Sequence, residues 1–167
     1  MKKFYKFLFL LVMLVPYVAK AQLIEPVIWT VETEKLNKNE YNIVFKAEIE
    51  DGWHLYSQNT PLGGPMPLYF DFVEVVGAER QGEVVEPEVT IAYNDVFEID
   101  EHFFEKEAIF KQKVKLLDGT ATVAGTISGQ ACKESCVQLT YDFEVQLGEP
   151  AVIEDASEKA SAGGESL

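Results

Sequence analysis

The chain has 167 residues, of which 14 are Lys or Arg and 28 are Asp or Glu, so its formal net charge is −14. This acidity argues against nucleic acid and anionic membrane surfaces as partners, because both attract basic side chains. Hydrophobic residues make up 47% of the chain, which excludes global disorder and fits one domain of ordinary size.

Residues 1–21 have the features of a secretory signal peptide. Three lysines within the first six residues precede the apolar run Phe7–Val15, and Ala19-Lys20-Ala21 has the small-x-small cleavage pattern. The apolar run is shorter than the about 20 residues that span a bilayer, although an uncleaved anchor is the alternative. We therefore expect a soluble mature chain from Gln22 onward in a bacterial periplasm, with no direct membrane insertion after cleavage.

Strand patterns dominate the mature chain, and no long amphipathic helix is evident. Tyr41–Ile49, Ala108–Leu116 and Leu139–Leu147 alternate apolar and polar residues, as half-buried strands do. Further strands are expected at Val27–Val31, Leu68–Phe72 and Thr120–Ile127, with a loop at Pro61–Pro67. Many short strands joined by Gly, Pro and Asp-Gly turns predict an all-β fold, an immunoglobulin-like antiparallel β-sandwich forming a single domain over 22–149. Residues 150–167 are expected to form a disordered acidic tail.

Cys132 and Cys136 are the two cysteines of the chain, and three residues separate them. A disulfide closing so short a loop contributes only about 2 kcal/mol in the chain-entropy model, so the pair has little value as a staple. The spacing leaves a redox-active pair, a static hairpin clip, half of a metal site and two free thiols as alternatives.

Zinc normally takes four ligands, and only His54 and His102 could add nitrogen, at no spacing that joins them to the cysteines. We therefore expect neither a metal nor a cofactor.

Three segments together resemble the amino-terminal periplasmic domain of the thiol:disulfide interchange protein DsbD. They are Asp51-Gly52-Trp53-His54-Leu55-Tyr56-Ser57, Asn94-Asp95-Val96-Phe97, and Gly129-Gln130-Ala131-Cys132 with Cys136. The resemblance covers about residues 24–147 and implies the same sandwich fold. It also implies electron relay: reducing equivalents pass from a thioredoxin-like or membrane-embedded donor to oxidised periplasmic proteins, a protein-disulfide reductase activity.

The resemblance also implies roles for individual residues. Cys136 would attack and form mixed disulfides, Cys132 would resolve them, and Phe97 would cap the pair, with Phe103 or Phe104 as the alternative cap. His54 and Tyr56 would line the site, with Asp95 nearby.

Two features depart from the family pattern: the spacer between the cysteines is short, and Val137-Gln138 stands where the family has prolines. The alternative function is an exported β-sandwich for binding or scaffolding, in which the disulfide is structural.

Overall fold

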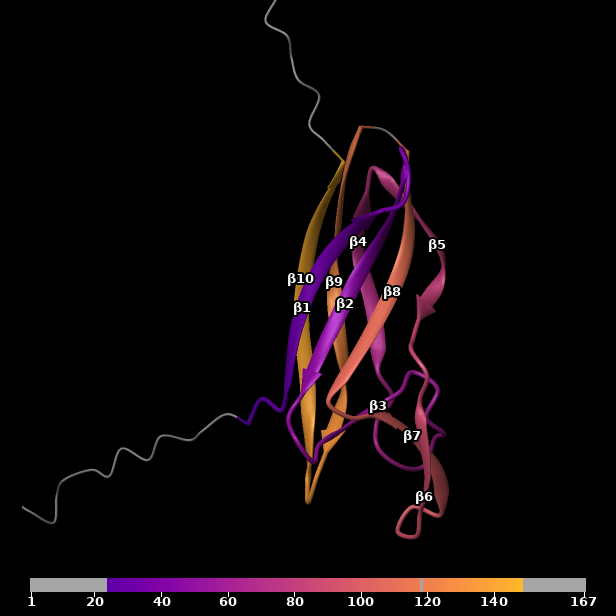
Figure 1. The fold of residues 1–167 in the computed structure, drawn as a ribbon, viewed down its shortest axis with the longest axis vertical. Helices are drawn as coiled ribbons and strands as arrows, with labels where there is room; N and C mark the ends of the chain where they lie inside the picture. The colour runs from indigo at the N-terminus through magenta and orange to yellow at the C-terminus, as the bar shows by residue number, and fades with distance from the viewer. Residues whose placement is uncertain (1–23, 118, 149–167) are drawn as a thin grey trace, which may run out of the picture.

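The computed structural model describes residues 24–117 and 119–148, and in these ranges the chain forms ten β-strands and no helix (Figure 1). The strands are β1 (Val27–Lys35), β2 (Glu40–Ile49), β3 (His54–Tyr56), β4 (Tyr69–Val76), β5 (Ala78–Val85), β6 (Thr90–Asn94), β7 (Ile99–Phe104), β8 (Glu107–Leu116), β9 (Thr120–Cys132) and β10 (Cys136–Gly148). The proposed signal peptide and the proposed acidic tail lie outside the described residues.

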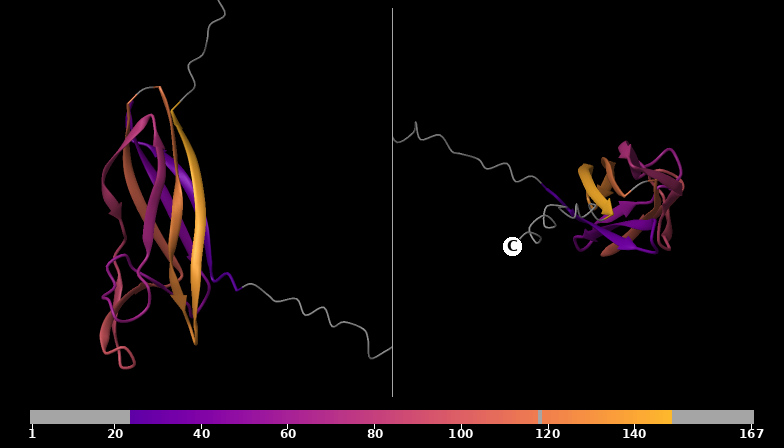
Figure 2. Two further views of the ribbon diagram at one scale, coloured as in Figure 1. Left: turned by 180° about the vertical axis from the view of Figure 1, so that it is seen from behind. Right: turned by 90° about the horizontal axis from the view of Figure 1, so that it is seen from above.

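All strand pairs are antiparallel, and they form two sheets. The first sheet has the order β1-β2-β8-β5, and the second has the order β10-β9-β3-β7-β6, with β4 also paired to β9. Figure 1 looks through the first sheet onto β9 and β10, and Figure 2 gives the reverse and end-on views of the two layers. The predicted fold class, an antiparallel immunoglobulin-like sandwich, is confirmed.

The core lies between the sheets and is built from the strand faces that alternation predicts. Tyr41, Ile43, Phe45, Ala47 and Ile49 share one face of β2, and all five are buried. Phe45 packs at its centre, with its ring centroid 5.1 Å from that of Phe70 and 4.9 Å from that of Phe143 on the opposite sheet. Burial of each such ring stabilises the fold by about 2–3 kcal/mol.

The second sheet carries an extension that positions the candidate site. Strand β9 is long enough to pair with β4 along residues 122–128 and with β3 only at its end, through Ala131 and Cys132. Strands β7 and β6 then follow β3 outward, and the figures show them at the end of the molecule that holds the tip of the β9–β10 hairpin (Figures 1 and 2). The alternation pattern identified none of β3, β5, β6 and β7.

Residues 24–117 and 119–148 contain no helix that is both long and apolar enough to cross a membrane.

Candidate functional site

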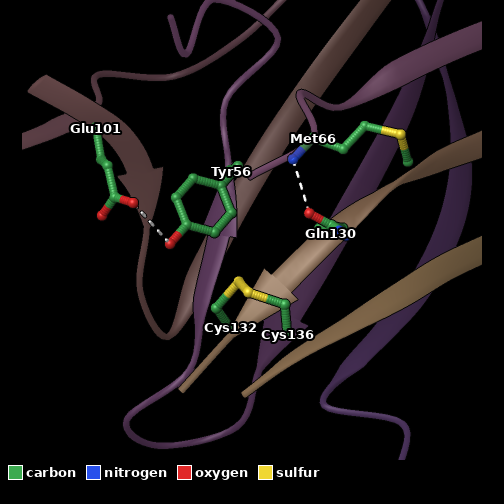
Figure 3. The surroundings of a disulfide bond; sticks show 6 residues. All are labelled: Tyr56, Met66, Glu101, Gln130, Cys132 and Cys136. Atoms are coloured by element: carbon green, nitrogen blue, oxygen red, sulfur yellow. Dashed lines mark hydrogen bonds between the residues drawn. A yellow bond between two sulfur atoms is a disulfide. The ribbon is translucent and has the colours of Figure 1, made fainter. Parts of the chain in front are cut away.

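The cysteine pair closes the tip of the β9–β10 hairpin. Cys132 ends β9 and Cys136 begins β10, so the two are directly opposite in the antiparallel register. Their Cα atoms are 4.0 Å apart and their sulfur atoms are bonded at 2.01 Å (Figure 3). The intervening turn is closed by a hydrogen bond in which the Lys133 N–H donates to the Ser135 carbonyl at 3.1 Å. The short spacer thus suits a disulfide across a three-residue hairpin turn.

The two cysteines differ in their access to solvent. Cys132 is only 7% exposed and lies in a small buried cluster with Tyr56 and Phe103. Cys136 is exposed at the start of β10. A partner can therefore approach Cys136 more readily than Cys132, which is buried with Tyr56 and Phe103.

Strands β3 and β7 supply the wall behind Cys132. His54 is the cross-strand partner of Cys132, and Tyr56 is the partner of Phe103. The His54 ring stacks on the Phe103 ring, with centroids 3.9 Å apart and planes inclined by 12°. Nε2 of His54 lies 3.3 Å from a carboxylate oxygen of Glu105, so the edge of the imidazole that carries Nε2 faces Glu105.

A tyrosine and a glutamate form a buried polar pair beside the disulfide. The Tyr56 hydroxyl donates a long hydrogen bond of 3.4 Å to Glu101, and Figure 3 shows the hydroxyl directed toward the Glu101 carboxylate. Both residues are buried. Burial disfavours the phenolate, and the Glu101 carboxylate adds repulsion and the hydrogen bond, so together they raise the pKa of Tyr56 to about 12. Tyr56 therefore remains a neutral phenol at physiological pH.

Lys133 attaches the β9–β10 hairpin to the turn that precedes β3. Its Nζ donates to the Asp51 carbonyl at 2.9 Å, and its side chain passes over Gly52. Gly52 has φ of +81°, and a Cβ at this position would lie 3.0 Å from Lys133 Cε. The Asp-Gly turn predicted from sequence therefore does more than end the strand, because Gly52 has no side chain and leaves room for Lys133.

The loop between β3 and β4 packs against the hairpin. The Gln130 side chain accepts a hydrogen bond of 2.8 Å from the Met66 N–H (Figure 3). The Thr60 hydroxyl accepts from the His102 N–H at 3.1 Å, which attaches the same loop to β7. The disulfide therefore sits on a hydrogen-bonded support rather than on a free hairpin.

The structure separates the three candidate cap residues. Phe103 lies in the cluster with Cys132, whereas Phe104 packs in the main core. Phe97 lies in the β6–β7 turn with Asp95, is 40% exposed, and approaches Gly64 in the 61–67 loop. Of the three, Phe103 is thus the one whose ring borders the buried cysteine, together with His54 and Tyr56.

Sequence reasoning did not identify Glu101. One signal was available: alternation along a strand places Glu101 on the same face as Phe103, two residues later. This signal could be used only if residues 99–104 were recognised as a strand. In addition, one acidic residue does not stand out in so acidic a chain. Within the described ranges, His, Cys, Asp and Glu side chains form no group of three or more that could hold a metal ion.

Comparison with known proteins assigns a family. The family model described as "Thiol:disulfide interchange protein DsbD, N-terminal" matches residues 21–148. The chain belongs to this family. Membership, together with two cysteines at disulfide distance, supports thiol–disulfide interchange as the general chemistry of the DsbD-like chain.

One solved structure has a similar fold, and a second gives a weaker match. The N-terminal periplasmic domain of ScsB from Proteus mirabilis is similar with a TM-score of 0.55 and 15% identity, over 75% of this chain and 49% of that chain. The chain therefore spans about half the length of that relative. The reduced DsbD N-terminal domain from Neisseria meningitidis matches with a TM-score of 0.44 and 15% identity, over 72% of this chain and 85% of that chain. Among curated proteins, no match was found.

Proposed function

We propose that this DsbD-like chain is an exported thiol–disulfide relay. It takes reducing equivalents from a thioredoxin-like or membrane-embedded dithiol and passes them to oxidised proteins in the periplasm. Residues 1–21 are its cleaved export signal, and 22–149 are the working domain. The observation that carries the proposal is the unequal exposure of the pair: Cys136 is open to a partner, and Cys132 is buried behind it.

In the proposed reaction, the Cys136 thiolate attacks one sulfur of a substrate disulfide. A Cys136–substrate disulfide forms, the substrate disulfide breaks, and the released substrate thiolate takes up a proton. Cys132 then loses its proton and attacks the Cys136 sulfur, which forms the Cys132–Cys136 disulfide and releases the second substrate thiol. The substrate gains two electrons and two protons, and a donor dithiol restores the pair by the reverse steps.

The surroundings do not favour a free thiolate. Thiolates form most readily near positive charge, and the spacer offers Lys133 alone, whose ammonium group is bound to the Asp51 carbonyl. Glu134, in the same spacer, is acidic. We therefore propose that Cys136 reacts slowly with small reagents and gains reactivity inside a partner complex.

The alternative is that the disulfide is a static hairpin clip. The reduction potential of the Cys132–Cys136 disulfide distinguishes this alternative from the relay. A relay pair should equilibrate with a thioredoxin-type dithiol, whereas structural disulfides typically lie below about −300 mV. We expect the potential of the purified protein, measured in glutathione and dithiothreitol redox buffers, to lie above that value. A value well below it would support the clip.

Trapping tests the roles of the two cysteines. The probe is a thioredoxin that keeps a single active-site cysteine, activated as a mixed disulfide with 2-nitro-5-thiobenzoate. With this probe Cys132→Ala should accumulate a stable protein–thioredoxin disulfide, because Cys136 displaces the aromatic thiolate and neither protein retains a second thiol to resolve the product. The matched variant Cys136→Ser retains only the buried thiol and should trap several-fold less. Equal trapping by both variants, seen on non-reducing gels and by mass spectrometry, would remove the assignment of Cys136 as the attacking residue.

A further inference from the structure

The outer strand β6 differs from the other outer strands of the described sheets. Strands at a sheet edge expose unpaired N–H and C=O groups, and proteins commonly protect them with charges or bulges. Every other outer strand follows this rule. Charged residues lie at Glu32, Glu34 and Lys35 in β1, Asp71 and Glu74 in β4, Glu79, Arg80 and Glu83 in β5, and Asp142 and Glu144 in β10, and the pairings of β4 and β5 also contain register shifts.

Strand β6 has no such protection. Its sequence, Thr90-Ile91-Ala92-Tyr93-Asn94, contains no charge and no proline, and among the described residues it pairs only with β7. Ile91 is 58% exposed and Tyr93 is 60% exposed. An unprotected edge with exposed apolar side chains is suited to pairing with an added strand.

The turn after β6 extends this apolar surface and is held in a fixed shape. The Asn94 side-chain oxygen accepts hydrogen bonds from the N–H groups of Val96 at 2.8 Å and Phe97 at 3.2 Å. The Glu98 N–H returns to the Asn94 carbonyl at 2.8 Å, and Glu98 adopts φ of +57°. Val96 is 85% exposed at the tip. The exposed apolar groups are therefore presented by an ordered turn.

The charges around β6 select the partner. Residues 86–105 contain seven acids, Glu86, Glu88, Asp95, Glu98, Asp100, Glu101 and Glu105, and no Lys or Arg. If a second copy paired antiparallel with β6, Glu88 before the strand would lie toward Asp95 after it, so like charges would meet at both ends. A segment bearing Lys or Arg on either side of an extended apolar stretch meets complementary charge instead.

The edge also lies within reach of the disulfide. Strands β3 and β7 separate β9, which carries Cys132, from β6, so Cys132 is three inter-strand steps of about 4.8 Å, or roughly 14 Å, from the edge, and Cys136 on β10 is four steps, or roughly 19 Å, away. An interface of standard size covers about 800 Å² on each partner, which is a patch roughly 32 Å across. One partner can therefore contact β6 and Cys136 at the same time.

We propose that β6 and the β6–β7 turn form the docking surface for the redox partner, which adds an extended, lysine- or arginine-flanked segment as a strand to the β6 edge. This inference rests on the proposed relay for the identity of the partner. Strand addition aligns the partner while its cysteine meets Cys136, and Phe97 with Val96 covers the end of the added strand.

The test uses the full mature domain carrying Cys132→Ala and Cys136→Ser, so that binding is measured without disulfide chemistry. The probe is a fluorescein-labelled peptide of alternating valine and threonine flanked by lysine pairs, followed by fluorescence anisotropy. Ile91→Lys gives β6 the charge that the other outer strands have, and should weaken binding about tenfold, the effect of losing one or two net hydrogen bonds. The matched control is Ile28→Lys on β1, an isoleucine that is 63% exposed.

Two further peptides separate strand pairing from charge alone. Methylation of alternate backbone nitrogens in the lysine-flanked peptide should weaken binding about tenfold, because it removes the donors that pair with β6. Replacement of the lysine pairs by glutamate pairs should weaken it similarly. Equal binding by the methylated peptide, or equal losses in Ile91→Lys and Ile28→Lys, would overturn the proposal. So would a dimer in sedimentation that Ile91→Lys dissociates, because the occupant would then be a second copy.

Failure of the relay and failure of the docking surface give different results. If the relay is wrong and the docking surface is right, the cysteine-free domain still binds the lysine-flanked peptide at β6. If the docking surface is wrong and the relay is right, the cysteine-containing protein reduces a lysine-flanked disulfide peptide at the same rate with and without Ile91→Lys.

Discussion

At the scale of single residues, the main feature of the site is the burial of Cys132 against two aromatic side chains. The Cys132 sulfur is enclosed by Tyr56 and Phe103, and the phenol of Tyr56 faces a buried carboxylate. Glu101 is a buried acid near the cysteine pair, and burying a charged group is costly unless the group has a partner. The Tyr56 hydroxyl donates a hydrogen bond to Glu101, so the protonation state of this hydroxyl affects the site.

The raised pKa of Tyr56 gives a pH-dependent contribution to stability. The unfolded chain releases this proton near pH 10, whereas the folded chain retains it to about pH 12. The contribution is therefore complete below pH 10, falls as the pH rises through this window, and is lost above it. Two pKa units correspond to about 2–3 kcal/mol.

Urea unfolding of the wild type and Tyr56→Phe over this pH range checks the effect. The difference in the free energy of unfolding between the two should change by about 2–3 kcal/mol in favour of the variant as the pH rises from about 10 to about 12. Tyr69→Phe, at an exposed tyrosine, is the control and should run parallel to the wild type. Parallel curves for Tyr56→Phe as well would show that the phenol is not shielded.

At the scale of elements, the strands recognised from sequence are those with one buried face. β2, β8 and β10 alternate because one side faces the core, and the same pattern predicts their register. β6 is exposed along nearly its whole length, so it shows no alternation, and β3 is only three residues long. Two strands of the β3–β7–β6 extension, β3 and β6, are therefore ones that sequence patterns could not reveal.

The choice of cap residue follows from the placement of β7. The family resemblance favoured Phe97, but nothing in the local sequence shows that Phe103 pairs with Tyr56 across β3, since this contact spans 47 residues of chain. We propose that Phe103 shields Cys132. Phe103→Leu should raise the rate at which iodoacetamide alkylates Cys132 in the reduced protein several-fold, at a cost of about 1 kcal/mol in stability.

Site-resolved mass spectrometry of the alkylated protein separates the two candidates. Phe97→Leu is the matched variant and should leave the Cys132 rate unchanged, because Phe97 lies in the β6–β7 turn. If alkylation of Cys132 were faster in Phe97→Leu and unchanged in Phe103→Leu, Phe97 and not Phe103 would be the residue that shields Cys132.

At the scale of the whole molecule, the long strands and the end of the sandwich that carries the disulfide differ in what they contain. Most of the apolar core lies between the long strands, where β9 and β10 pair along thirteen residues. The tip of the β9–β10 hairpin, which carries the disulfide, lies at the same end of the molecule as β3, β7, β6 and the β6–β7 turn (Figures 1 and 2). This arrangement separates the stability of the fold from the chemistry at its tip, which a redox domain requires because its disulfide must open and close without unfolding it.

That separation predicts that opening the disulfide has a small effect on stability. The bond closes a loop of five residues, so it contributes about 2 kcal/mol in the chain-entropy model, and the rest of the β9–β10 ladder remains paired without it. The variant Cys132→Ala/Cys136→Ser avoids placing a hydroxyl in the buried cluster. It should fold, with a free energy of unfolding about 2 kcal/mol below that of the oxidised wild type by urea denaturation. The wild type in excess dithiothreitol is the matched control, because it lacks the bond but keeps both sulfur atoms, and it should agree with the variant to about 1 kcal/mol. A loss of more than about 4 kcal/mol in both would mean that the sandwich depends on its disulfide, as a structural clip requires and a relay does not.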